Sequence, residues 1–124
     1  MSNKGKILVV EDNDFVRMQL CKFIEDDGFG IVEAKNGEEA LVAINDDIAL
    51  AIVDVRMEPL GGFEFVRTIR GDENKTPIII VTGDDNHDLL SEASRLGIGA
   101  VLRKPVQKER LIKIISRTLE IERR

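Results

Sequence analysis

Apolar residues in this chain form short runs that alternate with longer stretches of helical periodicity. The runs at residues 7–10, 50–53 and 78–81 are unbroken and of strand length, as is typical of strands buried on both faces of a parallel sheet. Residues 31–34 are interrupted by Glu33 and predict an edge strand, and residues 100–102 predict a brief last strand. The chain is therefore expected to contain five strands, with Lys6 opening the first.

Between the runs, apolar residues recur three or four positions apart, which predicts five amphipathic helices. Asn and Asp residues that precede these stripes are available as N-caps, with residues 84–86 expected to cap the fourth helix, and glycines follow most stripes. The residues expected to face inward are Val16, Leu20, Phe23 and Ile24 in the first helix, Ala40, Leu41 and Ile44 in the second, Phe63, Val66 and Ile69 in the third, Leu89, Leu90, Ala93 and Leu96 in the fourth, and Leu111, Ile112, Ile115 and Leu119 in the fifth.

Strict alternation of strands and helices predicts an α/β fold with a parallel sheet, right-handed crossovers and helices on both faces. We expect residues 1–124 to form one three-layer αβα domain of the flavodoxin-like type, with five strands in the order 2-1-3-4-5. This order brings the C-terminal ends of the first and third strands side by side, at the point where open α/β sheets bind their ligands.

Composition narrows the functional classes. The formal net charge of −5 argues against nonspecific nucleic-acid binding, and no apolar run reaches membrane-spanning length. The start of the chain lacks a secretory cleavage pattern, so we expect a cytoplasmic protein that is not bound to membranes. The only cysteine, Cys21, lies in a helical pattern and is expected to be a buried packing residue.

Acidic residues stand at the ends of two strands that should be neighbours. Glu11 and Asp12 follow the first strand, and Asp54 ends the third. An aspartate after a strand is by itself a common turn former or helix cap, so the assignment depends on what surrounds it. Three carboxylates brought together repel one another, and a hard divalent cation such as Mg2+, which prefers oxygen ligands, would relieve that repulsion.

A hydroxyl and an ammonium are expected at the same edge of the sheet. Thr82 ends the fourth strand and Lys104 follows the fifth. A hydroxyl donor, an ammonium and a metal ion around one carboxylate form a site suited to negative charge developing on a phosphoryl group.

With these residues in place, the chain resembles a response-regulator receiver domain of two-component signalling, similar to the single-domain chemotaxis regulators. The resemblance covers the whole chain and rests on five features in the expected order. These are Glu11-Asp12, Asp54, the loop residues Met57 and Gly62, Thr82, and Lys104-Pro105.

The resemblance implies a role for each matching residue. Asp54 would be the phosphoacceptor, taking a phosphoryl group from a histidine kinase or a histidine phosphotransfer protein. Thr82 and Lys104 would bind phosphoryl oxygens, and the peptide bond between Lys104 and Pro105 would be cis, as is feasible before proline.

For the metal, the resemblance implies that Mg2+ is the cofactor. Its ligands would be Asp12, Asp54, the backbone carbonyl of Arg56, and Glu11 acting through water.

The chain departs from the family pattern at two places. The family usually has Tyr or Phe three residues before the lysine, where this chain has Val101. A proline usual four residues after the phosphoacceptor is replaced by Glu58, with Pro59 one position later. The first departure puts the usual output switch in question, and we expect weaker coupling from Asp54 to the face formed by the fourth helix, fifth strand and fifth helix.

Other classes lack what they would need. A haloacid-dehalogenase-like phosphatase requires a second aspartate two places after the first, where this chain has Arg56, and a flavodoxin-like FMN protein requires a Ser/Thr/Gly-rich phosphate loop where this chain has EDND. We therefore expect a signalling switch, monomeric or weakly dimeric, that acts on no separate metabolite. It is either a single-domain regulator or relay member, or a receiver excised from a longer regulator or hybrid kinase.

Overall fold

The computed structural model describes residues 4–83 and 87–122, with His87, Ile121 and Glu122 described by their backbone alone. Five parallel strands pair in the order β2-β1-β3-β4-β5, as the alternating pattern predicts. The strands are β1 (Lys6–Val10), β2 (Gly30–Ala34), β3 (Ile48–Asp54), β4 (Ile78–Thr82) and β5 (Ala100–Arg103). The helices are α1 (Asp14–Asp26), α2 (Gly37–Ala43), α3 (Gly62–Gly71), α4 (His87–Arg95) and α5 (Lys108–Glu122).

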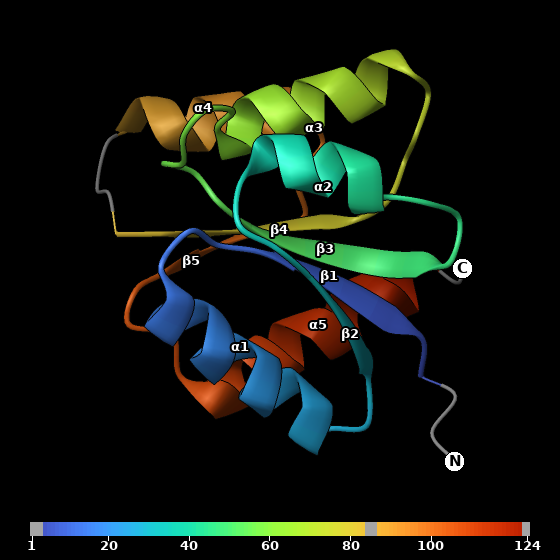
Figure 1. Ribbon diagram of the computed structural model, residues 1–124. Coiled ribbons are helices and arrows are strands. Elements are labelled where there is room, and N and C mark those ends of the chain that lie inside the picture. The colour runs from blue at the N-terminus through green and yellow to red at the C-terminus, as the bar shows by residue number, and fades with distance from the viewer. Residues whose placement is uncertain (1–3, 84–86, 123–124) are drawn as a thin grey trace.

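The helices lie in two layers, one on each face of the sheet. Figure 1 shows α1 and α5 below the sheet and α2, α3 and α4 above it. The expected three-layer αβα architecture is therefore confirmed. All five strand C-terminal ends lie along one edge of the sheet, because every strand pair is parallel.

Successive residues of the central strands feed two separate hydrophobic cores. In β3, Leu50 and Ile52 pack in the core between the sheet and helices α1 and α5. Ala51 and Val53 pack in the core on the other face, between the sheet and helices α2 and α3. Side chains alternate between the two faces of a strand, so a strand covered on both faces must be apolar at every position. This double burial explains the unbroken apolar runs in the sequence.

The buried face of α1 differs slightly from the predicted stripe. Its buried residues are Arg17, Leu20, Cys21 and Ile24. Cys21 is buried as expected, and burial raises the pKa of its thiol to about 12, which keeps it protonated and unreactive. The arginine in this face was not predicted, because an arginine normally belongs on the solvent side of an amphipathic helix.

The prediction that Leu90 faces inward is wrong. Leu89 and Ala93, four residues apart on α4, are both buried, while Leu90 is 58% exposed. The two leucines are adjacent in sequence and point about 100° apart around the helix axis, and the packing of α4 on the sheet buries the side of Leu89 and leaves that of Leu90 at the surface. Gly97 follows α4 with φ of 69°, and Ile98 N–H donates to the carbonyl of Ala93, as expected for a helix that ends at a glycine. The expected caps at residues 84–86 lie outside the described residues.

Gly62 allows α3 to approach the end of β3. A Cβ on Gly62 would lie 2.2 Å from the carbonyl oxygen of Asp54, which is far inside van der Waals contact. The amide of Gly62 also donates to the carbonyl of Val55 at 3.0 Å. The start of α3 is thus packed directly on the backbone that carries Asp54, and only glycine fits there.

We predict that Gly62→Ala lowers the free energy of unfolding by about 1–3 kcal/mol, the usual cost of overpacking. Gly71→Ala is the matched control, because it lies at the other end of α3 and a methyl group there meets nothing within 4 Å. Since alanine has less freedom than glycine in the unfolded chain, the control should be neutral or stabilising by up to about 1 kcal/mol. Urea unfolding of the two variants measures both effects, and equal stabilities would contradict the prediction.

Candidate functional site

Three carboxylates meet at the C-terminal edge of the sheet. β1 pairs with β3 so that Val10 lies opposite Val53, which places Glu11 and Asp54 side by side as the next residues of their strands. Carboxylate oxygens of Glu11, Asp12 and Asp54 lie within 4.8 Å of one another. Glu11 and Asp54 are 1% and 7% exposed, whereas Asp12 is exposed to solvent. The predicted acidic cluster is therefore present, with one member open to solvent.

Lys104 neutralises part of this negative charge. Its Nζ lies 2.7 Å from Oε1 of Glu11 and 3.2 Å from Oδ1 of Asp54. The backbone amide of Lys104 donates to the carbonyl of Thr82 at 2.8 Å, which ties the end of β5 to the end of β4. The peptide bond between Lys104 and Pro105 is cis, as is the bond between Glu58 and Pro59.

Burial and repulsion perturb the titration of the cluster. Burial raises the pKa of Asp54 most, the Lys104 ammonium opposes it, and the charge of Asp12 adds to the rise. Burial likewise raises the pKa of Glu11 against the opposing effect of Lys104. Burial lowers the pKa of Lys104 itself, but the Glu11 and Asp54 carboxylates outweigh it and hold that pKa above its ordinary value. The ammonium is therefore charged at neutral pH.

A cavity of about 400 Å³ opens directly onto Asp54. Its walls are formed by Asp54, Arg56, Thr82, Gly83 and Lys104. Thr82 is buried at the end of β4, and Arg56 is exposed in the loop after β3. Four of the residues predicted from the sequence thus line one hollow, and Asp54 is the member of the acidic cluster that faces it. The position of the Arg56 carbonyl as a metal ligand stays a prediction.

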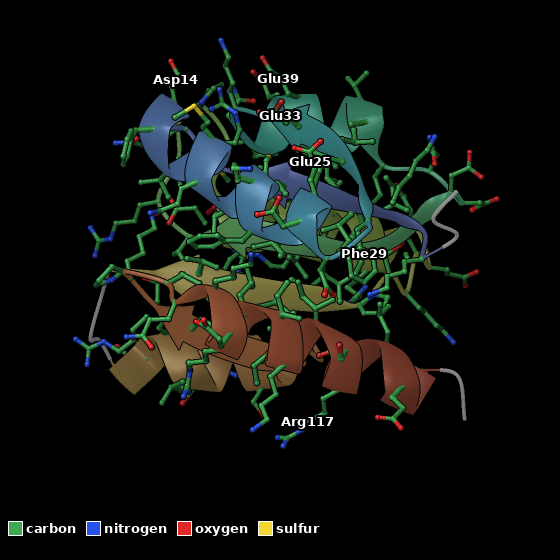
Figure 2. All side chains as sticks on the ribbon, turned by 90° about the horizontal axis from the view of Figure 1, so that it is seen from below. Asp14, Glu25, Phe29, Glu33, Glu39 and Arg117 are labelled. Atoms are coloured by element: carbon green, nitrogen blue, oxygen red, sulfur yellow. The ribbon has the colours of Figure 1, made fainter. Side chains whose placement is uncertain are left out.

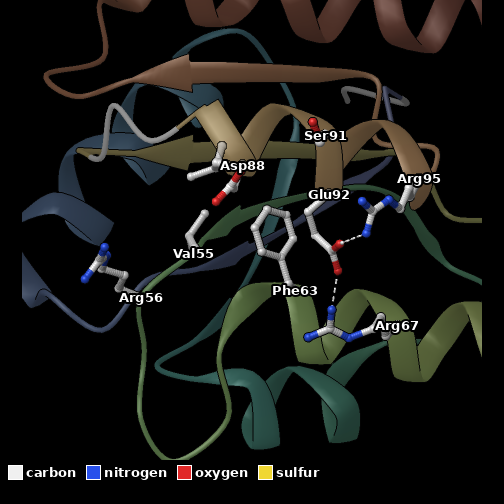
Figure 3. A pocket seen from close by; sticks show the side chains of 9 residues that line it. Val55, Arg56, Phe63, Arg67, Asp88, Ser91, Glu92 and Arg95 are labelled. Atoms are coloured by element: carbon white, nitrogen blue, oxygen red, sulfur yellow. Dashed lines mark hydrogen bonds and ion pairs between the residues drawn. The ribbon is translucent and has the colours of Figure 1, made fainter.

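A larger cavity of about 650 Å³ lies beside this one, between α3 and α4. Figure 3 shows the Phe63 ring in it and Glu92 paired with two arginines. Glu92 of α4 forms an ion pair with Arg67 of α3, and Arg95 contributes a second at 3.4 Å. Glu92 is already neutralised there, and none of the predicted residues Asp54, Thr82 and Lys104 lines this cavity, so we assign the site to the smaller cavity around Asp54.

The residues at this edge suit a hard divalent ion. Three carboxylates and one ammonium leave a formal charge of −2, and a divalent cation would balance it. Oε1 of Glu11 is buried and accepts no well-aligned hydrogen bond from the described residues, although the ammonium lies close to it. An all-oxygen donor set with one solvent-exposed member is what Mg2+ prefers, because Mg2+ retains several waters.

Comparison with known proteins agrees with this geometry. Residues 7–116 match the sequence model of the response regulator receiver domain. The chain belongs to this family. The structure of chemotaxis protein CheY4 from Vibrio cholerae superposes with a TM-score of 0.85 at 31% identity, covering 92% of this chain and 98% of that one.

Curated relatives of this receiver are longer proteins. The transcriptional regulatory protein FixJ of Bradyrhizobium diazoefficiens is 31% identical over 116 residues, which are 93% of this chain and 57% of FixJ. A cyclic di-GMP phosphodiesterase of Thermotoga maritima is 30% identical over 105 residues, which are 85% of this chain and 28% of that protein. The chain spans well under two thirds of either relative, so their names describe more than the part they share with it.

Family membership establishes the general class of this chain. Receiver domains are signalling switches of two-component systems that bind Mg2+ at an acidic pocket and interact with histidine kinases or phosphotransfer proteins. The phosphatase and FMN-binding alternatives are therefore set aside. No helix in the described part of the receiver is long and apolar enough to cross a bilayer.

We predict that the crowded carboxylates of this receiver destabilise the metal-free fold as pH rises. Because the pKa of Asp54 is higher in the folded than in the unfolded chain, the folded state binds more protons above pH 3.8, the ordinary value. Stability is therefore lost as pH increases from 3.8 through the raised pKa.

Asp54→Asn removes this titration. Relative to Asp54→Asn, the wild-type free energy of unfolding should fall as pH increases from about 3.5 to neutrality. Chemical unfolding in chelator at constant ionic strength measures the difference. A difference that does not change with pH would show that the fold does not raise the pKa of Asp54.

Proposed function

We propose that Asp54 accepts a phosphoryl group from the phosphohistidine of a kinase or phosphotransfer protein. The observation that carries this proposal is the Asp54 carboxylate itself, 7% exposed yet opening onto a cavity that Thr82 and Lys104 line. A carboxylate in that position is reachable by an incoming phosphoryl group and is surrounded by groups that bind phosphoryl oxygens.

The transfer balances as a displacement at phosphorus. An Oδ of Asp54 forms the new P–O bond while the P–N bond to the donor imidazole breaks, and the imidazole leaves with the electron pair and takes up a proton. Lys104, already 3.2 Å from Oδ1, pairs with a phosphoryl oxygen, and the Thr82 hydroxyl donates to another. Attack by water on the same phosphorus returns Asp54 and inorganic phosphate. The protein thus assists its own phosphorylation and dephosphorylation without a separate metabolite.

Mg2+ is the proposed cofactor of this reaction. Asp12, Asp54, the Arg56 carbonyl and, through water, Glu11 would hold the ion. When bound, it supplies positive charge to the phosphoryl oxygens.

The surface beside the site supports a protein donor. Phe15 and Met18 are both exposed on α1, three residues apart and therefore on the same side of the helix. They follow closely after Asp12 in the chain. An exposed apolar pair on α1, soon after Asp12 in the chain, suits contact with a helical partner that presents a histidine.

We predict that a small phosphodonor with Mg2+ adds one phosphoryl group to the wild type and none to Asp54→Asn. The product should be stable in acid and labile in base, as an acyl phosphate is. Intact-protein mass spectrometry measures the addition. Asp47→Asn is the matched control, because Asp47 is an exposed aspartate before β3 and should be modified like the wild type. Undiminished modification of Asp54→Asn would overturn the assignment.

We also predict that Mg2+ stabilises the folded receiver. An ion that binds only the folded state adds about 2.7 kcal/mol at a hundredfold excess over its dissociation constant. Asp12→Ala should lose most of this gain, whereas Asp46→Ala, an exposed aspartate away from the site, should retain it. Unfolding midpoints with MgCl2 and with KCl of equal ionic strength test this, and identical midpoints would contradict a metal site here.

The proposed output route avoids Val101. Val101 is a half-buried residue of β5 that lies opposite Ile80 of β4. It packs against the core between the sheet and helices α2 and α3. Valine is β-branched, has few rotamers and carries no ring to turn from solvent into the site. Phosphorylation should therefore act on the segment after Thr82 and on α4 more than on β5 and α5.

Amide chemical shifts with and without a phosphoryl mimic test this route. The wild type should show changes near Asp54, after Thr82 and in α4, with small changes across β5 and α5. Val101→Phe restores a ring and should extend the changes into β5. Large changes across Arg103 and α5 in the wild type, or dimerisation driven by phosphorylation, would show that the usual coupling is intact.

A further inference from the structure

Arg17 is a charged residue buried beside the acidic site. It is 8% exposed, and among residues 4–83 and 88–120 it is the only buried basic residue. It shares the inward face of α1 with Leu20, Cys21 and Ile24. A buried charge is costly unless it is fully paired, so its partners indicate why it is there.

The guanidinium joins three elements around the site. Nη1 donates to the backbone carbonyl of Glu11 at 2.8 Å, Nη2 donates to Asp14 at 2.6 Å, and Nε donates to Glu33 of β2 at 3.0 Å. Figure 2 labels Asp14 at the start of α1 and Glu33 of β2 near the same helix. The planar guanidinium, with its several N–H donors, can satisfy three acceptors in these directions, whereas the single ammonium of a lysine lacks this geometry.

The contact with Glu11 reaches the site directly. The amide of Glu11 donates to the carbonyl of Ala34 at 3.1 Å, and its carbonyl accepts from Arg17. The amide of Asn13 then donates to Oε2 of Glu11 at 3.2 Å. The backbone of Glu11 is thus held by β2 at its amide and by Arg17 at its carbonyl, and that carbonyl belongs to the peptide unit that leads into Asp12.

We infer that Arg17 is a positioning residue that holds the Glu11–Asp12 turn in its metal-binding conformation before the ion arrives. The inference rests on the proposed Mg2+ site. Three carboxylates within 4.8 Å repel one another, and that repulsion favours opening of the exposed turn that carries Asp12. Arg17 opposes the opening through the Glu11 carbonyl, without touching the ion or the phosphoryl group.

The alternative is that Arg17 only supports the fold, by linking α1 to β2. Its ion pair with Glu33 would serve that purpose without any effect on the site. The two roles separate if Mg2+ affinity is measured apart from stability, since a supporting residue would change the free energy of unfolding and leave the affinity unchanged.

Three variants of the full chain make this separation. Arg17→Met keeps the length and removes every donor. Arg17→Lys keeps the positive charge and loses the planar guanidinium that donates to three acceptors. Glu33→Gln is the matched control, because it weakens the link to β2 and leaves the bond from Arg17 to the Glu11 carbonyl in place. Mg2+ alone is the probe, titrated while the amide signals of residues 11–13 are followed.

Arg17→Met should raise the Kd for Mg2+ by about 10–100-fold, the usual effect of removing a group that orients a metal ligand. Glu33→Gln should stay close to wild type, and Arg17→Lys should recover only part of the loss. Without Mg2+, the Asn13 amide should exchange with solvent faster in Arg17→Met than in wild type. If Arg17→Met does not fold, Arg17→Lys and Glu33→Gln still carry the comparison, because the lysine variant should bind Mg2+ more weakly than the glutamine variant.

Each contrary result has a distinct meaning. Equal Kd values for wild type and Arg17→Met, or full recovery by Arg17→Lys, would overturn the positioning role while the Mg2+ site stands. Failure of the wild type to bind Mg2+ would overturn the proposed metal site and the role of Arg17 with it.

Discussion

The structure depends on the repulsion among carboxylates held at one edge of a parallel sheet. The pairing of β1 with β3 sets Glu11 beside Asp54, and burial removes most of the water that would screen them. The pKa values of both groups are raised by burial in spite of the nearby Lys104. A fold selected for stability alone would not keep this cluster, so the crowding of carboxylates is best understood as a capacity to bind positive charge.

The surroundings of the cluster are built to withstand that repulsion. Lys104 bridges two carboxylates and is itself fixed through its amide to the end of β4. Gly62 lets the start of α3 pack against the carbonyl of Asp54. On the opposite side, Arg17 anchors the carbonyl of Glu11. Gly62 and Arg17 fix the backbone that carries Asp54 and Glu11, and Lys104 pairs with their carboxylates, so these two carboxylates are held close together.

The residue at position 101 bears on how a signal passes from Asp54 to the rest of the receiver. The chain keeps the phosphoryl-binding residues of a receiver but has Val101 where the family usually has an aromatic ring. Under the proposed function, the chemistry at Asp54 and the signal that leaves it are carried by different residues, so that a change in one leaves the other in place. A receiver of this kind suits a role in which recognition of Asp54 and its phosphoryl group matters more than movement of a distant face.

The sequence by itself determined the fold class, the strand order and the edge at which the site lies. Local pattern was sufficient for this, because doubly buried strands must be apolar throughout and parallel strands must end at one edge. The same reasoning brought together Glu11, Asp12, Asp54, Thr82 and Lys104, since each stands at or just after the C-terminal end of a strand.

Only the tertiary structure decided which side chains face inward where the pattern is ambiguous, and which groups outside the motif support the site. Leu89 and Leu90 are equally apolar, and packing of α4 on the sheet chose between them. Arg17 lies at helical spacing with Leu20 and Cys21, so the sequence carried a signal. Its meaning depended on Glu33 of β2, which is distant in the chain, and on Glu11, which follows β1 and contributes only its backbone carbonyl. Contacts of that kind depend on how elements meet in space, and residue type and spacing do not encode them.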